Sequence, residues 1–262
     1  MGIVNVTPDS FSDGGSYASP EAAAEAGRVM LAEGASLVDV GGESTRPGAE
    51  PVSEAEELRR VVPVLEHLAG CPVSVDTSRA EVARRAIALG ATMVNDVTAL
   101  RRDAELAGVV ADAGVEVCLM HMQGKPATMQ DAPRYEDVVD EVESFLGARL
   151  REAVAAGIHE ERIWLDPGIG FGKTADQNLE LLRRLDRIVA IGRPVLVGLS
   201  RTSTLARVAG EPDAVIASDA ASVGAAVAAF DRGATMFRVH DVRAHVEALA
   251  VAAAVERGRV ER

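Results

Sequence analysis

The sequence predicts one α/β domain, a (β/α)8 (TIM) barrel over residues 1–262, with its active site at the C-terminal ends of the strands. The length is one reason, because 262 residues come close to the roughly 250 typical of such a barrel. A second is that eight short apolar runs alternate with helix-like stretches, and a small polar cluster follows each run. Two small domains are the alternative, but no Pro-, Ser- or Gly-rich spacer divides the chain.

The apolar runs are the predicted strands. They are apolar on both faces, as a sheet covered by helices requires. In chain order they are residues 2–6 (GIVNV), 35–40 (ASLVDV), 72–75 (PVSV), 91–94 (ATMV), 116–120 (EVCLM), 162–165 (RIWL), 194–199 (PVLVGL) and 234–239 (ATMFRV).

The stretches between the strands have apolar residues at helical spacing. Pro20 stands at a favoured first-turn position, and Ser53 to Glu56 reads as a capping box. Alternating strands and helices imply parallel pairing through right-handed crossovers. An open doubly wound sheet is the alternative, but no G-x-G-x-x-G follows the first strand. The predicted helices cover residues 21–33, 53–68, 79–89, 103–113, 135–156, 176–190, 219–232 and 243–256, and most are followed by a closing glycine (Gly34, Gly90, Gly114, Gly157, Gly192, Gly233).

Composition excludes several classes of partner. The net charge of −13 argues against nucleic acid or an anionic membrane as the main partner. No segment has the length or polarity of a signal peptide or a transmembrane helix. Cys71 and Cys118 follow no metal-binding spacing, and free thiols suit a cytoplasmic protein. The chain begins almost inside its first strand, which leaves open a natural N-terminus further upstream.

Lysine is rare in this chain. It has only Lys125 and Lys173, against 25 arginines, and both lie in loops that follow strands. For Lys125, chance survival on a solvated loop is as good an explanation as function.

The first two strand-end loops carry candidate ligands for a cation and an anion. Asn5, Asp9 and Asp13 offer oxygen atoms that suit Mg²⁺, although an ordinary Asx-turn loop explains them equally well. In the second loop, Arg46 is a candidate phosphate partner, and a surface arginine in a turn is the competing explanation.

Acidic and amide side chains end the third, fourth and sixth strands, at Asp76, Asn95–Asp96 and Asp166. Carboxylates at an apolar barrel mouth are costly without donors, so they favour a heterocycle rich in N–H groups. Arg238 and His240 lie two apart on the eighth strand, and with Arg46 they form a basic corner. A heterocycle that carries a diphosphate fits both halves, and substitution at the carbon bearing the diphosphate is the natural reaction.

Seven segments resemble the dihydropteroate synthases of folate biosynthesis. The resemblance implies the same barrel fold, and a transferase that couples 6-hydroxymethyl-7,8-dihydropterin diphosphate to p-aminobenzoate, releasing diphosphate, with Mg²⁺. It also implies a cytoplasmic homodimer and a sulfonamide target. The segments are residues 2–15 (GIVNVTPDSFSDGG), 39–49 (DVGGESTRPGA), 74–77 (SVDT), 95–97 (NDV), 119–124 (LMHMQG), 166–173 (DPGIGFGK) and 238–242 (RVHDV).

The resemblance also implies roles for individual residues. The pterin group is Asp76, Asn95, Met120, Asp166 and Gly198; the diphosphate group is Thr45, Arg46, Arg238 and His240; the p-aminobenzoate group is Phe11, Pro47, Phe171 and Ser200; Asn5 ligates Mg²⁺; and Asp9, Asp13 and Asp166 are catalytic.

One position departs from the family pattern. The family reads Ser-Arg-Lys after the seventh strand, whereas this chain reads Ser200-Arg201-Thr202. Threonine cannot replace a lysine contact to the pterin, so either another cation such as Lys173 or Arg201 substitutes, or the enzyme is slow, or the residue is an engineered change. A non-catalytic pterin-binding paralogue and a pterin-dependent methyl transfer domain are the rival functions. The methyl transfer domain has no use for a basic corner.

Overall fold

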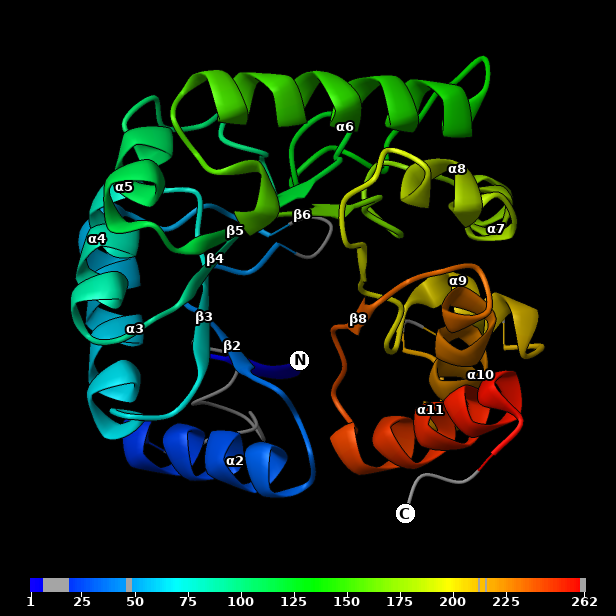
Figure 1. Cartoon of the computed structure of the whole chain (residues 1–262), viewed down its shortest axis with the longest axis horizontal. Helices are drawn as coiled ribbons and strands as arrows, with labels where there is room; N and C mark the ends of the chain where they lie inside the picture. Colours follow the sequence, from blue (N-terminus) through cyan, green and yellow to red (C-terminus); the bar gives the residue numbers. More distant parts are fainter. Residues whose placement is uncertain (7–18, 46–48, 212, 215, 260–262) are drawn as a thin grey trace.

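The computed structural model describes residues 1–6, 19–45, 49–211, 213–214 and 216–259. Eight parallel strands surround the centre and helices form the outer layer (Figure 1). All eight predicted strands are confirmed. They are β1 (Gly2–Asn5), β2 (Val38–Gly41), β3 (Val73–Asp76), β4 (Met93–Asp96), β5 (Glu116–Met120), β6 (Ile163–Asp166), β7 (Leu196–Val197) and β8 (Met236–Phe237).

The strands form a closed barrel through two kinds of contact. Strands β1 to β6 pair in chain order as one parallel sheet, and β7 pairs with β8 as a second. Single parallel bridges join the two sheets, from Leu165 to Val195 and from Gly2 to Val239. The Val239 backbone reinforces the second bridge, because its oxygen accepts from Ile3 at 3.1 Å and its N–H donates to Met1 at 3.0 Å. The prediction of a (β/α)8 barrel is therefore confirmed.

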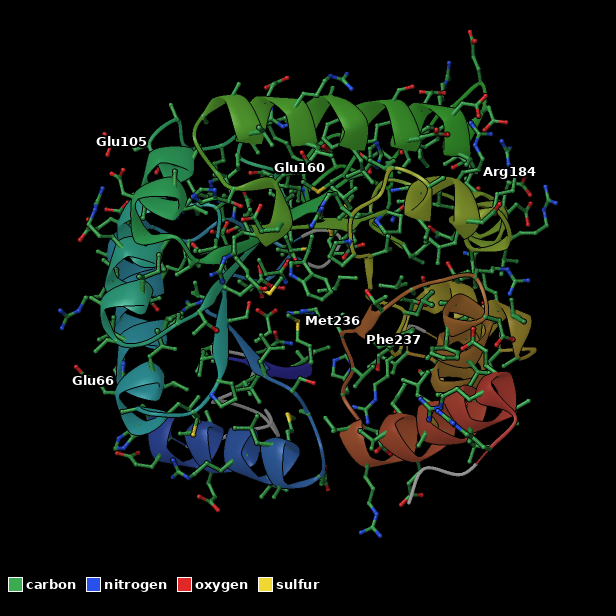
Figure 2. The ribbon with its side chains drawn as sticks, in the orientation of Figure 1. Glu66, Glu105, Glu160, Arg184, Met236 and Phe237 are labelled. Atoms are coloured by element: carbon green, nitrogen blue, oxygen red, sulfur yellow. The ribbon has the colours of Figure 1, made fainter. Side chains whose placement is uncertain are left out.

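The helices lie outside the barrel because each presents an apolar side to the strands. The largest cluster of buried apolar residues lies between these two layers. In Figure 2 the labelled Glu66, Glu105 and Arg184 lie on the outer layer and Met236 lies near the centre. The helices are α2 (Pro20–Ala32), α3 (Glu54–His67), α4 (Ala80–Ala88), α5 (Leu106–Ala113), α6 (Val138–Ala155), the 3₁₀ turn η1 (Glu160–Arg162), α7 (Ala175–Arg183), α8 (Leu185–Val189), α9 (Ser203–Val208), α10 (Asp219–Phe230) and α11 (Val242–Arg257).

Three details of the helices differ from the prediction. The stretch 176–190 is two helices, separated at Arg184, whose guanidinium bonds to Asp137 at 2.8 Å. The short helix α9 was not predicted. The capping box at Ser53 is half formed, because the Glu56 carboxylate binds arginines of its own helix instead of the cap. A complete box forms at Thr174.

The helix-closing glycines are confirmed. All six predicted positions have positive φ, from 64° at Gly114 to 104° at Gly34 and Gly90. The backbone at these positions turns left-handed after the last helical turn, a conformation that glycine adopts without a Cβ penalty.

The barrel interior below the mouth is mainly apolar. A separate cluster there contains Met1, Leu37, Met93, Cys118 and Leu196, with Trp164 and Met236 packed against it. This plug closes the lower end of the barrel and leaves the C-terminal ends of the strands as the open mouth. In the part of the chain that the structure describes, no helix combines the length and the apolar character needed to cross a membrane.

Candidate active site

Four strands bring buried side chains of the predicted pterin group to the barrel mouth. Asp76 ends β3, Asn95 is the second-last residue of β4, Met120 ends β5 and Asp166 ends β6, and all four are at most 9% exposed. Each lies there because the strands run parallel and end at the same edge. The structure therefore brings these four residues to the same end of the barrel, and their role in binding a pterin stays a prediction.

Asp39 of β2 connects this group to the eighth strand. Its Oδ2 accepts a hydrogen bond from Asn95 Nδ2 at 3.0 Å and from Arg238 Nε at 2.7 Å. Arg238 also donates from Nη2 to Asp76 Oδ2 at 3.1 Å. Asp39 is fully buried, and its Oδ1 has no hydrogen-bond partner among the described residues.

Sequence reasoning missed Asp39. A signal was present, because a carboxylate inside the apolar run SLVDV is costly unless a cation lies beside it. Its register could have indicated the partner, since Asp39 lies beside Ile3 of β1 and β1 meets the segment that carries Arg238.

The predicted separation of an acidic side from a basic side is wrong in one respect. Arg238 was assigned to the basic corner, but its half-buried guanidinium also forms ion pairs with Asp39 and Asp76. The physical reason is that burial penalises an isolated guanidinium as strongly as isolated carboxylates, so opposite charges pair inside the barrel. The basic and acidic groups therefore interlock.

Burial changes the acid strength of the two strand-end carboxyls. It raises the pKa of Asp76 to about 8, an effect that the Arg238 charge opposes and the Asp39 charge increases. It raises the pKa of Asp166 to about 6, against the hydrogen bond from Gly168 N–H at 2.7 Å and the charges of Lys173 and Arg238. Both carboxyls bind protons more tightly than exposed ones, as expected of groups that await a ligand with N–H donors.

His240 and Ser200 lie together on the opposite side of the mouth. His240 Nδ1 lies 3.0 Å from Ser200 Oγ, and the backbone N–H of His240 donates to the same oxygen at 3.2 Å. The resemblance assigned Ser200 to p-aminobenzoate and His240 to diphosphate. Their contact joins those two groups at the seventh and eighth strands.

Two further positions suit a flat ring. Phe171 packs against Val97, Met120, Met122 and Met129, an apolar cluster above the strand ends. At Gly198 an added Cβ would meet no atom of the described residues within 4 Å, which leaves space beside the end of β7. A cavity of about 430 Å³ opens from the mouth, and its lining includes Thr45, Asp76, Val97, Thr98, Arg101 and Met122.

Arg201 and Lys173 are the two cations named as substitutes for a lysine at position 202, and both are held by other groups. Arg201 binds the Asp219 carboxylate through Nε and Nη2 at 2.8 and 3.1 Å. The Lys173 ammonium donates to the Gly168 and Phe171 carbonyls at 2.8 and 3.0 Å. The Thr202 hydroxyl has no hydrogen-bond partner in the described part of the chain.

Several predicted residues lie outside the described part of the chain: Asp9, Phe11, Asp13, Arg46 and Pro47. Within the described ranges, no group of three or more His, Cys, Asp or Glu side chains could hold a metal. Asn5 ends β1, half-buried, and offers one amide oxygen. Mg²⁺ keeps several waters and binds substrate phosphates, so a single protein oxygen of this kind fits it.

The chain is similar to known pterin enzymes along most of its length. The family described as pterin binding enzyme matches residues 1–240. The dihydropteroate synthase of Neisseria meningitidis serogroup C is 49% identical over 254 residues, which are 95% of this chain and 89% of that protein. That of Escherichia coli K12 is 46% identical over 256 residues, 96% of this chain and 89% of the relative.

Solved structures agree with the sequence relatives. Xanthomonas albilineans dihydropteroate synthase with 4-aminobenzoic acid superposes with a TM-score of 0.89 at 50% identity, covering 98% of this chain and 92% of that one. The same enzyme in complex with 7,8-dihydropteroate gives a TM-score of 0.85 at 48% identity, with the same coverage. Fold, strand-end residues and relatives agree: the chain belongs to the dihydropteroate synthases, the pterin-binding transferases of folate biosynthesis.

Proposed function

We propose that the mouth of this barrel binds a dihydropterin diphosphate through Asp76, Asn95 and Asp166 and transfers its pterin-methyl group to p-aminobenzoate. The observation that carries the proposal is the buried cluster of two carboxyls and one amide at the ends of three strands. These groups are acceptors for a ring with several N–H donors. Met120 and Gly198 complete the pocket, one as an apolar wall and the other as open space.

Asp39 gives the Asn95 amide a direction. An ionised carboxylate only accepts, so the amide must turn its Nδ2 toward Asp39. The Asn95 Oδ1 is then available to accept a hydrogen bond from the ligand. The site therefore selects for an N–H edge at this point of the ring.

In the reaction, the bond between the pterin methylene carbon and the diphosphate oxygen breaks, and the electron pair leaves with diphosphate. The amine nitrogen of p-aminobenzoate then forms the new C–N bond and loses one proton. The Asp166 carboxylate stabilises the positive charge that develops on the pterin. We assign Asp9 and Asp13 to the amine side, with Asp13 near the proton that is lost.

Thr45, Arg46, Arg238 and His240 form the proposed diphosphate site. Arg238 has five N–H donors and uses Nε and Nη2 for Asp39 and Asp76, which leaves donors for an anion. Asn5 would hold Mg²⁺, which neutralises diphosphate charge when bound.

The p-aminobenzoate ring is proposed to lie against Phe11, Pro47, Phe171 and Ser200. Crystal structures of the Xanthomonas albilineans and Thermus thermophilus enzymes contain 4-aminobenzoic acid or 4-aminobenzoate. The Yersinia pestis enzyme has been solved as a sulfonamide drug complex. By analogy, we propose that this chain also binds sulfonamides in the p-aminobenzoate pocket.

Diphosphate release measured with and without p-aminobenzoate tests the function. Release that requires the amine, with 7,8-dihydropteroate as product, supports the synthase. Tight pterin binding without release supports a non-catalytic paralogue instead.

Position 202 determines how fast the proposed reaction runs. The Lys173 and Arg201 cations are bound elsewhere, so we propose that Thr202 lowers the rate without abolishing it. Thr202→Lys is expected to raise kcat/KM about tenfold, in line with one gained charge-assisted contact. Dihydropteroate formation measures this, with Thr202→Val as the control, and no gain in rate would show that Thr202 is no handicap.

We also propose a cytoplasmic homodimer acting on small molecules. Cys71 and Cys118 are both free, as in proteins of reducing compartments. The late helix α10 is rich in alanine and allows close packing against a second copy, although an ordinary buried helix is the alternative. Light scattering on the purified chain tests the dimer.

A further inference from the structure

Lys173 is one of two lysines in a chain with 25 arginines, and the proposed reaction gives it no part. It is 2% exposed. It lies in the loop that joins β6 to α7, which starts directly after Asp166 and also contains Phe171. Its burial beside a loop that carries two proposed site residues indicates a role that an exposed loop lysine would not have.

Four acceptors surround the Lys173 amino group, three of them within 3.0 Å and the fourth, the His121 carbonyl oxygen, at 3.5 Å. Its Nζ lies 2.8 Å from the Gly168 oxygen, 3.0 Å from the Phe171 oxygen and 2.9 Å from His121 Nδ1. An ammonium group has three N–H donors, so this arrangement uses all of them. A guanidinium is planar and larger, and it cannot direct three donors to acceptors grouped around one atom. The geometry explains why arginine does not replace lysine here.

His121 is suited to be an acceptor. Burial and the neighbouring Lys173 charge lower the pKa of His121 to about 2, so the ring is neutral at working pH. Its Nδ1 then carries the lone pair that receives the lysine proton donor. The ring is fixed edge-on against Phe145, with 4.9 Å between centroids.

The backbone of the β6–α7 loop packs directly against the backbone of the loop after β5, with no room for a side chain between them at two glycines. A Cβ at Gly168 would lie 1.9 Å from the His121 oxygen, and a Cβ at Gly172 would lie 2.5 Å from the Gln123 oxygen. Both glycines also have positive φ, at 66° and 63°. Such a tightly wound loop turns carbonyl oxygens inward, and the N–H donors of the buried Lys173 side chain satisfy those of Gly168 and Phe171.

We propose that Lys173 is a positioning residue whose hydrogen bonds fix Asp166 and Phe171 relative to one another. The path to Asp166 runs through Gly168, whose oxygen binds the ammonium and whose N–H binds the Asp166 carboxylate at 2.7 Å. The path to Phe171 is direct, through its own carbonyl. This role rests on the proposed function, because it concerns the pterin and p-aminobenzoate sides of that reaction.

The test is Lys173→Met, which keeps the length of the side chain and removes the charge and the donors. We expect kcat to fall about tenfold and KM for p-aminobenzoate to rise about tenfold, because small displacements at an active site cost this much or more. KM for the pterin diphosphate should change less, since Asp76 and Asn95 stand on other strands. Lys173→Arg should not restore either constant.

The control is Ile188→Ala, a core truncation in α8, far from the loop in sequence and fully buried. It lowers the melting temperature and leaves KM for p-aminobenzoate unchanged, which separates general destabilisation from positioning. If Lys173→Met does not fold, His121→Leu removes one acceptor and is expected to raise the same KM. An unchanged KM for p-aminobenzoate in the folded variant overturns the proposal.

Failure of the proposed function gives a different result. If the natural chain forms no dihydropteroate, binding of p-aminobenzoate in the presence of pterin and diphosphate is measured by calorimetry. Weaker binding by Lys173→Met still supports the positioning role, and equal binding overturns it.

Discussion

At the residue scale, one buried carboxylate organises the site. Asp39 orients the Asn95 amide and holds the Arg238 guanidinium, so it couples the proposed pterin and diphosphate groups without reaching the mouth itself. Asp76, Asn95 and Asp166 could be predicted from the sequence, because each follows directly on an apolar segment that predicts a strand. Asp39 could not be assigned in the same way, because its role depends on neighbours 56 and 199 positions away.

Asp39→Asn changes the shape of the side chain very little, but it is expected to lower substrate binding and turnover strongly because it removes the negative charge. The neutral amide cannot offset the Arg238 charge, so KM for the pterin diphosphate should rise and kcat/KM should fall by about a hundredfold. Steady-state kinetics measures both. Ser74→Ala is the matched control, because Ser74 is Asp39's register neighbour on β3 and its hydroxyl has no partner among the described residues. Equal losses in the two variants would contradict the role of Asp39.

The pKa of Asp166 predicts a pH dependence with a defined sign. Its value rises from an ordinary 3.8 to about 6 in the folded protein, so folding favours the protonated form. The associated stability is present below pH 3.8 and is lost as pH rises to about 6, a difference of about 3 kcal/mol. Asp166→Asn should therefore gain stability relative to the natural chain between pH 4 and pH 6, as measured by denaturant unfolding. A constant difference across this range would contradict the expectation.

Activity should show the opposite trend over the same range. The Asp166 carboxylate stabilises positive charge only when ionised, so kcat/KM should rise with pH through about 6. Initial rates between pH 5 and pH 8 test this. A profile that is flat through pH 6 would indicate that Asp166 is not the group that limits the rate.

At the scale of elements, local signals predicted the helices and strands well and failed where tertiary contacts decide. The break between α7 and α8 has no glycine or proline to mark it, and Arg184 at that point binds carboxylates of α6. Helix α9 has six residues, too few for a periodic pattern. Its start follows Arg201, which has a positive φ of 60° that no sequence rule requires of arginine.

The capping box of α7 predicts a measurable contribution to stability. Thr174 Oγ1 accepts from Gln177 N–H at 3.2 Å, and Gln177 Oε1 accepts from Thr174 N–H at 2.8 Å. Thr174→Ala should cost about 1 kcal/mol, as the loss of an N-cap hydroxyl usually does. Thermal unfolding measures the loss, and Thr174→Ser, which keeps the hydroxyl, is the control. An unchanged melting temperature in Thr174→Ala would show that the box contributes nothing.

At the scale of the whole molecule, the barrel could be predicted because every unit repeats the same order of strand, polar loop, helix and glycine. The number of units predicts that the barrel closes. It does not predict that strand pairing is extensive from β1 to β6 and short around β7 and β8. Strands β7 and β8 are two residues each, and among the described residues a single bridge links this pair to β6 and another links it to β1. Proline at 194 and glycine at 198 flank the seventh strand, and neither extends a ladder well.

This uneven closure has a consequence for how the molecule opens. The two junctions between the sheets, at Leu165–Val195 and Gly2–Val239, have few hydrogen bonds to break. The parallel pair β7–β8 should therefore separate from the six-stranded sheet before global unfolding. Amide hydrogen exchange is expected to be faster at Val195 and Val239 than at Val75 or Val94. Ser200, Arg238 and His240 adjoin that pair of strands, so a substrate that contacts both sheets would slow hydrogen exchange most at these junctions. Bound substrate would then stabilise the closed form of the barrel.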